Sequence, residues 1–162
     1  MRRRKRVESS RRYVVDTSVL LECILEASPY RGRVEELLAL APRAIEIYLT
    51  PLTVAELLYT ASKIYTAAGV EDANAEARNF VKWALARARV VDADVSTSLR
   101  AGELRKQFRI ALPDCYAIAA AERLGAVALF LKPEREMLPK LDELRKLPLA
   151  FLAELADQFE SA

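Results

Sequence analysis

Histidine is absent from all 162 residues of this sequence. That absence excludes catalytic triads and dyads with an imidazole base, and it excludes zinc and haem sites with histidine ligands. The two cysteines, Cys23 and Cys115, stand far apart and predict neither a disulfide framework nor a zinc cluster. Unpaired cysteines favour a reducing setting, so we expect a cytoplasmic protein. Any catalysis must therefore use carboxylates, hydroxyls, lysine or a hard metal ion.

Glycine and long apolar runs are also scarce. The chain has four glycines, and none forms a glycine-rich phosphate loop, which argues against a nucleotide-binding α/β domain. No apolar run approaches the roughly 18 residues that suggest a membrane span. The charged N-terminus is not followed by an apolar segment, so no secretory signal is predicted. We therefore expect no membrane contact.

Charge is distributed unevenly although the net charge is only +2. Residues 1–12 hold seven basic residues and one glutamate, whereas the remaining 150 residues hold 18 basic and 22 acidic ones. We expect residues 1–12 to form a basic, disordered arm that could also follow a phosphate backbone. A single domain is expected over residues 13–152, followed by a tail or helix over residues 153–162.

The body of the chain alternates short apolar segments with helical patterns. Strands are predicted at residues 13–16, 45–49, 90–91 and 127–131. Helices are predicted at residues 18–27, 31–41, 52–68, 71–88, 96–108, 113–124 and 134–146. Residues 147–152 fit either a last edge strand or a turn into a terminal helix. This order predicts an α/β fold with three layers, α/β/α, around a short-stranded, mainly parallel sheet.

Four acidic residues fall at predicted strand ends and helix starts. Asp16 directly follows the first strand, and Glu134 follows the fourth. Glu56 lies in the helix after the second strand, and Asp114 lies just inside the helix that Pro113 opens. Parallel α/β folds bind ligands beyond the carboxyl ends of their strands. Carboxylates gathered there resist ionising together, and a cation such as Mg²⁺ or Mn²⁺, which prefers oxygen ligands, resolves that conflict.

Each acid taken alone also has a structural explanation. Asp114 could be a favourable charge in a first helical turn. Glu134 and Glu136 could both be solvated charges at a helix start. Glu56 stands in a strongly apolar stretch, although helix surfaces carry many glutamates. The metal-site hypothesis therefore depends on the set of four acids rather than on any one of them.

The segments around these acids resemble the motifs of the PIN-domain family. Val14-Val15-Asp16-Thr17-Ser18 is similar to the family's apolar strand followed by Asp-x-Ser/Thr. Residues 50–57 resemble its second acidic motif, and residues 112–121 resemble its third, an aspartate followed by an Ile-Ala-Ala helix. Residues 129–137 match the fourth motif less well. The similarity covers roughly residues 13–150.

The fourth motif departs from the family pattern at two positions. Family members usually have Thr or Ser where Lys132 stands and Asp where Glu134 stands. Glu134 has a longer reach, and Glu136 could take its place as the fourth acid. Lys132 could weaken metal binding or contact a phosphate instead.

The resemblance implies an endoribonuclease of the kind found in VapC-like toxins of toxin–antitoxin pairs. Asp16, Glu56, Asp114 and Glu134 would then hold one or two Mg²⁺ or Mn²⁺ ions for the hydrolysis of RNA. Ser18 would orient Asp16 by hydrogen bonding or bind a metal-bound water, and it could also be the N-cap of the next helix. The resemblance further implies a homodimer and a small antitoxin protein as partner.

Two further groups of residues are candidates for ligand contact. The basic group could bind RNA or could simply be an exposed helix face, and consists of Arg100, Arg105, Lys106 and Arg109. The apolar group could line a groove for a partner or could pack in the core, and consists of Leu58, Tyr59 and Tyr65.

Two alternatives to a nuclease remain at this point. The first is a non-catalytic PIN-like module that binds RNA or protein in RNA processing, which Lys132 and the missing fourth aspartate favour. The second is an adhesion-type metal site with the pattern Asp-x-Ser-x-Ser. Residues 16–20 lack its second serine, because Leu20 stands there, which argues against this reading.

Overall fold

A single parallel sheet forms the centre of the structure, a computed structural model that describes residues 12–155. Its strand order is β3-β2-β1-β4-β5, and every neighbouring pair is parallel. The strands are β1 (Arg12–Val15), β2 (Glu46–Leu49), β3 (Arg89–Val90), β4 (Val127–Phe130) and β5 (Leu149–Phe151). The predicted α/β class and parallel sheet are therefore confirmed.

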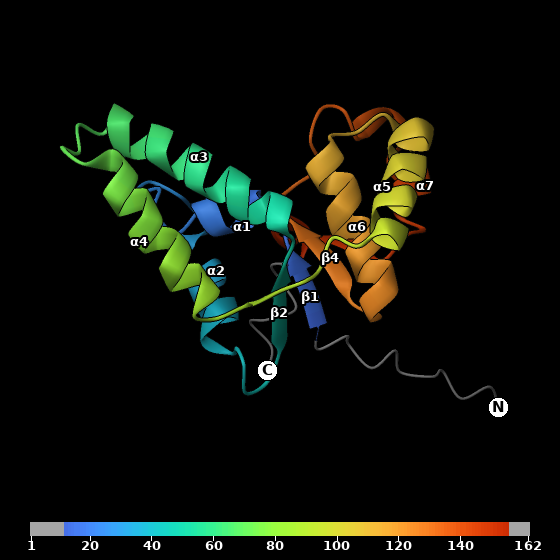
Figure 1. Cartoon of the computed structure of the whole chain (residues 1–162), viewed down its shortest axis with the longest axis horizontal. Coiled ribbons are helices and arrows are strands. Elements are labelled where there is room, and N and C mark those ends of the chain that lie inside the picture. The colour runs from blue at the N-terminus through green and yellow to red at the C-terminus, as the bar shows by residue number, and fades with distance from the viewer. Residues whose placement is uncertain (1–11, 156–162) are drawn as a thin grey trace.

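Helices cover both faces of this sheet, which completes the predicted three layers (Figure 1). On one side lie α1 (Thr17–Leu21), α2 (Arg31–Ala39), α3 (Pro51–Ala67) and α4 (Ala73–Leu85). On the other side lie α5 (Val95–Phe108), α6 (Leu112–Leu124) and the short α7 (Leu141–Leu144). Helices α3 and α4 form an antiparallel hairpin that extends away from the sheet (Figure 1).

Two apolar cores share the sheet as a common wall. Side chains alternate between the two faces of a strand, so Val14 packs toward α5 and α6 while Val15 packs toward α1 to α4. Strand β4 repeats this pattern with Phe130 on the first side and Leu129 on the second. Burying each such side chain contributes about 1.5–3 kcal/mol, so the central strands are held firmly from both sides.

Caps that are visible in the sequence define helix α3, which follows β2, and helix α6, which precedes β4. Thr50 accepts a hydrogen bond from the Thr53 backbone N–H at 3.1 Å, and Pro51 is the first residue of α3. Helix α6 ends at Gly125, whose φ of 60° lies in the left-handed region that favours glycine. These caps fix where the acid-bearing helices begin and end.

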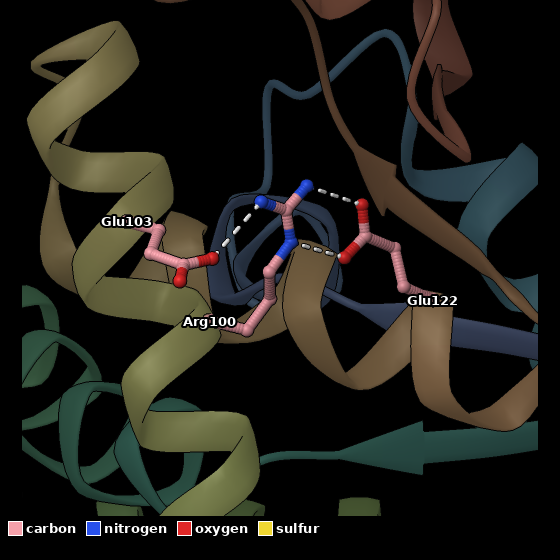
Figure 2. Close-up of polar contacts among 3 residues, drawn as sticks. All are labelled: Arg100, Glu103 and Glu122. Carbon is pink, nitrogen blue, oxygen red and sulfur yellow. Dashed lines mark hydrogen bonds and ion pairs between the residues drawn. The ribbon is translucent and has the colours of Figure 1, made fainter.

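A partly exposed ion pair joins α5 to α6. Arg100 donates from Nε and Nη2 to the two carboxylate oxygens of Glu122, at 2.7 and 2.9 Å, and it also contacts Glu103 at 3.4 Å (Figure 2). Arg105, another member of the predicted basic group, donates to the Ile110 carbonyl at 3.4 Å. Two of the four predicted RNA contacts are thus engaged within the protein, while Lys106 and Arg109 are exposed.

Two predicted helices are wrong in extent. The helix expected over residues 18–27 ends at Leu21, because the next three backbone N–H groups bond to carbonyls three residues back and tighten the turn. The helix expected over residues 134–146 is replaced by a 3₁₀ turn at Leu138–Lys140 followed by α7. Pro139 explains this break, because a proline inside a helix removes a hydrogen bond and clashes with the preceding turn.

The remaining predictions concern the two ends of the chain. The ambiguous residues 147–152 contain the edge strand β5, and a 3₁₀ turn at Leu152–Glu154 follows it directly. Most of the predicted basic arm (residues 1–11) and of the predicted tail (residues 156–162) lies outside the described residues. Between residues 12 and 155, no helix has the length and apolar character needed to cross a membrane.

Candidate metal centre

The four predicted acids lie at one end of the sheet, where the strands have their carboxyl ends. Asp16 follows β1 and Glu134 follows β4, and these two strands are neighbours. Glu56 is on α3, which begins after β2, the other neighbour of β1. Asp114 is in the first turn of α6, and α3 and α6 contact each other. The fold therefore gathers the four side chains from four different elements.

Asp16 is a buried carboxylate at the centre of this end. Its side chain is 4% exposed, and its backbone N–H donates to the Leu129 carbonyl at 2.9 Å. Burial raises the pKa of Asp16, whereas hydrogen bonds from Ser18 and from the Thr17 backbone lower it. Hydrogen bonds from its own turn thus offset part of the effect of its loss of solvent on the Asp16 pKa.

Ser18 links Asp16 to the backbone directly after β4 through hydrogen bonds. Its hydroxyl donates to Asp16 Oδ2 at 2.6 Å, and its backbone N–H donates to the same oxygen at 3.0 Å. The hydroxyl oxygen also accepts a hydrogen bond from the Leu131 backbone N–H at 3.2 Å. Asp16 is itself the N-cap of α1, so Ser18 does not cap that helix. In the structure Ser18 orients Asp16, which was one of its two predicted roles.

Asp114 experiences the surrounding negative charge most strongly. The side chain is 5% exposed, and burial raises its pKa to about 8 together with the charges of Asp16, Glu134, Glu56 and Glu136. An aspartate normally titrates near 3.9, so this carboxyl lies in a site where several acids cannot all be ionised at low cost. That mutual effect links all five acids electrostatically.

Glu56 is half-buried beside Thr17. Burial and the charge of Asp16 raise the pKa of Glu56, the Thr17 hydroxyl lowers it, and the charge of Glu134 raises it further. Thr17 Oγ1 is buried and makes no hydrogen bond of normal geometry within the described residues. A buried hydroxyl whose hydrogen bond is poorly formed is costly, and the nearest acceptor of Thr17 in the acidic centre is Glu56.

Glu134 lies at the solvent side of the group. Partial enclosure raises the pKa of Glu134 although its side chain still contacts water, and the charges of Asp16 and Glu136 raise it further. Glu136 and Lys132 are both exposed. Lys132 is not one of the charges that shift the pKa of Asp16, Asp114 or Glu134. Both Glu134 and Glu136 raise the pKa of Asp114, so both lie near enough to be candidates for the fourth acid.

These residues fit a hard divalent cation. The available donors are carboxylate and hydroxyl oxygens, which suit Mg²⁺ and Mn²⁺, and a cation would relieve the repulsion that raises the pKa of Asp114. Within residues 12–155, no three acidic or cysteine side chains converge closely enough to enclose an ion by themselves. Mg²⁺ is commonly held by one or two carboxylates and several water molecules, so such an enclosure is not required.

Comparison with known protein families identifies this arrangement. The family model of the PIN domain matches residues 13–132, which include Asp16, Glu56 and Asp114. The chain belongs to the PIN domain family. The resemblance seen in the sequence is therefore confirmed, although Glu134 lies two residues beyond the matched part of this PIN domain. A search of curated proteins found no match.

Solved structures with the same fold include several toxin–antitoxin proteins. VapBC from Salmonella typhimurium, bound to DNA, has a TM-score of 0.62 at 19% identity and covers 86% of this chain and 97% of that one. VapBC2 from Rickettsia felis, bound to a promoter DNA fragment, has a TM-score of 0.60 at 19% identity, with 86% and 98% covered. VapC20 from Mycobacterium tuberculosis, a toxin that cleaves the sarcin–ricin loop, has a TM-score of 0.57 at 15% identity, with 72% and 86% covered. At these identities the similarity shows the fold.

One residue that bears on the site was missed in the sequence. Thr17 stands between Asp16 and Ser18, and only these two neighbours have a role predicted from the sequence. The available signal was a second hydroxyl directly beside the first acid. Its burial and its position next to Glu56 depend on how α1 packs against α3. This packing cannot be predicted from the residues next to Thr17 in the sequence.

Proposed function

We propose that this PIN domain is a Mg²⁺- or Mn²⁺-dependent endoribonuclease. Asp16, Glu56 and Asp114 would hold the metal, with Glu134 or Glu136 as a fourth acid at the solvent side. The observation that carries the proposal is the state of Asp114, whose pKa is raised to about 8 by burial and by the charges of the other acids. Strongly perturbed carboxyls gathered at the ligand-binding end of a parallel sheet indicate a functional site.

The residues around the acids support hydrolysis of a phosphodiester. A divalent cation bound there supplies Lewis-acid polarisation of the phosphoryl group and activation of water. Ser18 keeps the Asp16 carboxylate in one orientation through two hydrogen bonds, of 2.6 and 3.0 Å. The buried Thr17 hydroxyl, which lies beside Glu56, is available as a further oxygen donor. Lys132, exposed at the end of β4, is placed to attract the phosphate of an incoming strand.

Cleavage of a labelled mixture of structured and single-stranded RNAs tests this proposal. We expect cuts with Mg²⁺ or Mn²⁺ that stop in EDTA and that fall at least 100-fold in Asp114→Asn. Asp142→Asn is the matched control, because this exposed aspartate lies on α7 away from the acids, and it should cleave normally. Cleavage that persists in EDTA, or in the Asp114 variant, would contradict the proposal.

The alternative function is a non-catalytic PIN module that binds RNA or protein. Lys132 favours it, because a cation stands where a metal-binding family member usually has a hydroxyl. Absence of cleavage together with absence of Mn²⁺ binding by calorimetry would favour this alternative. Mn²⁺ binding that is lost in Asp114→Asn would count against it even if no substrate had been found.

We also propose that the nuclease is the toxin of a toxin–antitoxin pair. The support is the fold shared with VapBC proteins and an open hollow between α2 and α4 that could receive an apolar partner segment. Tyr65, Phe80 and Trp83 line it, and Phe80 stacks on Trp83 with 5.7 Å between ring centroids. Of the residues expected in such a groove, Leu58 packs in the core and Tyr59 is 65% exposed without lining this hollow.

Self-association is a further part of the proposal. Val95 and Leu99 are 76% and 67% exposed and lie one turn apart on α5. Two large exposed aliphatic side chains on one helix face favour burial against a second copy.

A cytoplasmic location likewise stays a prediction, consistent with Cys23 and Cys115 both being free thiols.

A further inference from the structure

Tyr59 is an exposed aromatic residue on helix α3. It is 65% exposed, whereas every other aromatic side chain between residues 12 and 155 is buried or partly buried. It packs in neither apolar core, and it does not line the hollow between α2 and α4. A single exposed apolar side chain is ordinary on a protein surface, so the neighbours of Tyr59 decide what it can bind.

Those neighbours are an acid of the metal centre and a cation. Glu56 precedes Tyr59 by three residues on α3, and side chains at this spacing are adjacent, with about 5–6 Å between their Cβ atoms. Lys63 follows by four residues, and its Nζ lies 5.2 Å from the Tyr59 ring centroid. A carboxylate, an aromatic ring and an ammonium group thus follow one another along α3. We call Tyr59 and Lys63 the outer pair.

The opposite face of α3 is fixed in the core. Thr53, Leu57 and Ala61 are fully buried and recur at four-residue spacing, which places them on one face of the helix. The outer pair lies on the other face. Helix α3 contacts α6 and runs outward from it to the end of the hairpin (Figure 1). The outer pair is therefore held on a rigid element that leads away from the acidic centre.

Both side chains of the outer pair are accessible to a ligand. Lys63 is exposed, and it forms no ion pair with any residue from 12 to 155. The exposure of Tyr59 leaves ring surface accessible to a planar group in addition to its contact with Lys63. No other large apolar residue of α3 is exposed, so this face offers little apolar area for burial against a protein.

We propose that Tyr59 stacks on an unpaired base of the RNA substrate and that Lys63 binds the adjoining phosphate. This assignment rests on the proposed nuclease function, because Glu56 belongs to the site that would hold the scissile phosphate. A ring beside a cation matches a single-stranded nucleotide, which is a planar base joined to an anion. Along the helix axis, Tyr59 and Lys63 lie about 4.5 and 10.5 Å beyond Glu56, at 1.5 Å per residue.

The outer pair would select RNA that is unpaired next to the cut. A base inside a duplex is stacked on its neighbours and cannot present its face to a protein ring, whereas bases in loops, bulges and ends can. Stacking accepts any base, because every base has an aromatic face. The expected substrates are therefore unpaired segments of varied sequence.

Fluorescence anisotropy in EDTA tests the outer pair with a labelled 12-nucleotide single-stranded RNA and with the same RNA in a duplex. The full chain carries Asp114→Asn throughout, so that neither metal nor cleavage enters the measurement. Tyr59→Ala removes the ring, Tyr59→Phe keeps it, and Lys63→Gln removes the charge. The matched controls are Leu40→Ala, an exposed apolar residue at the end of α2, and Lys82→Gln, an exposed lysine on α4. A thermal melt checks the folding of each variant.

The ring and the charge should affect different quantities. Tyr59→Ala should weaken single-strand binding about tenfold, and Tyr59→Phe should preserve it, because stacking needs only the ring. Lys63→Gln should reduce the slope of log affinity against log salt by about 0.7, as expected for one phosphate of a single strand. Duplex affinity should stay within about twofold in Tyr59→Ala, because a paired base does not reach the ring. Both controls should bind as the parent chain does.

Three results would overturn the proposal: single-strand affinity that survives Tyr59→Ala, a parent chain that binds no RNA, or a dimer that Tyr59→Ala converts to a monomer in light scattering. The last result would assign the ring to a protein interface. Cleavage assays with Mn²⁺ and an intact Asp114 keep this proposal distinct from the nuclease proposal. There, Tyr59→Ala should raise KM about tenfold and leave kcat nearly unchanged. Absence of cleavage by every chain would contradict the nuclease function, and the anisotropy in EDTA would still decide the role of Tyr59.

Discussion

Replacing Asp114 by asparagine should stabilise the metal-free protein while it abolishes activity. The pKa of Asp114 is raised to about 8 in the folded chain, against an ordinary value of 3.8. A raised carboxyl pKa means that the folded state holds the proton more tightly than the unfolded state. Stability from this group is therefore fully present below the unfolded-state pKa and is lost as pH rises toward 8.

The size of the effect follows from the same two values. Each pH unit above the unfolded-state pKa costs about 1.4 kcal/mol until the folded-state pKa is reached, which gives an upper limit of about 4 kcal/mol at pH 7. Relaxation of the side chains and entry of water reduce this, so we expect Asp114→Asn to gain about 2–4 kcal/mol. For a chain of this length, that corresponds to a rise in Tm of roughly 5–15 °C.

Thermal melts in EDTA between pH 5 and pH 8 measure this gain. The difference between the wild type and the Asp114 variant should widen as pH rises, and Asp142→Asn should follow the wild type. Adding Mn²⁺ should then stabilise the wild type and leave the variant nearly unchanged, because a ligand stabilises only the form that binds it. Equal melting temperatures across the whole pH range would refute the reasoning.

Three further outcomes are expected. Ser18→Ala should lower cleavage at least tenfold and cost about 1–3 kcal/mol in urea unfolding, because it leaves the backbone N–H of Leu131, directly after β4, unpaired; an unchanged rate would mean that the hydroxyl does not orient the first acid. Arg100→Met should cost less than about 1 kcal/mol in the same assay, because its ion pair with Glu122 is partly exposed. It should leave RNA affinity unchanged, because Arg100 is already paired within the protein; a loss of RNA affinity would show that Arg100 contacts the substrate. Leu99→Asp should convert a dimer to a monomer in light scattering and lower the Tm slightly, because a partner subunit stabilises the folded chain, and a dimer that persists would place the interface elsewhere.

The sequence was sufficient to predict most of the fold because β1, β2 and β4 contain short apolar runs and several of the helices between them have caps that the sequence shows. The acids could be predicted for the same reason, since their positions follow directly from where strands and helices end. Asp16 needed only an apolar strand before it, and Asp114 needed only Pro113 to begin the helix. These signals are local, and the local structure that they favour is kept in the folded protein when no distant contact opposes it.

Apart from the break at Pro139, which is a local signal, the parts that were not predicted depend on contacts between distant segments. The pattern after residue 21 is apolar and suits a helix, yet the chain turns there, and the Ser28 hydroxyl donates to the buried carboxylate of Glu22. The Thr17 hydroxyl gains significance only because α3 brings Glu56 beside it. Arg100 looked like a surface cation until α6 placed Glu122 opposite it (Figure 2). In each case the partner lies six or more residues away, beyond the reach of a periodic pattern.

The position of β1 at the middle of the sheet has a consequence for how slowly this site exchanges hydrogen with solvent. The Asp16 N–H is bonded to the Leu129 carbonyl on β4, between two apolar layers that would both have to separate before water reached it. Such amides exchange mainly through global unfolding, whereas helix ends and edge strands open locally. The backbone beneath the acids should thus be among the last in the protein to incorporate deuterium, even though the carboxylates above it face a ligand.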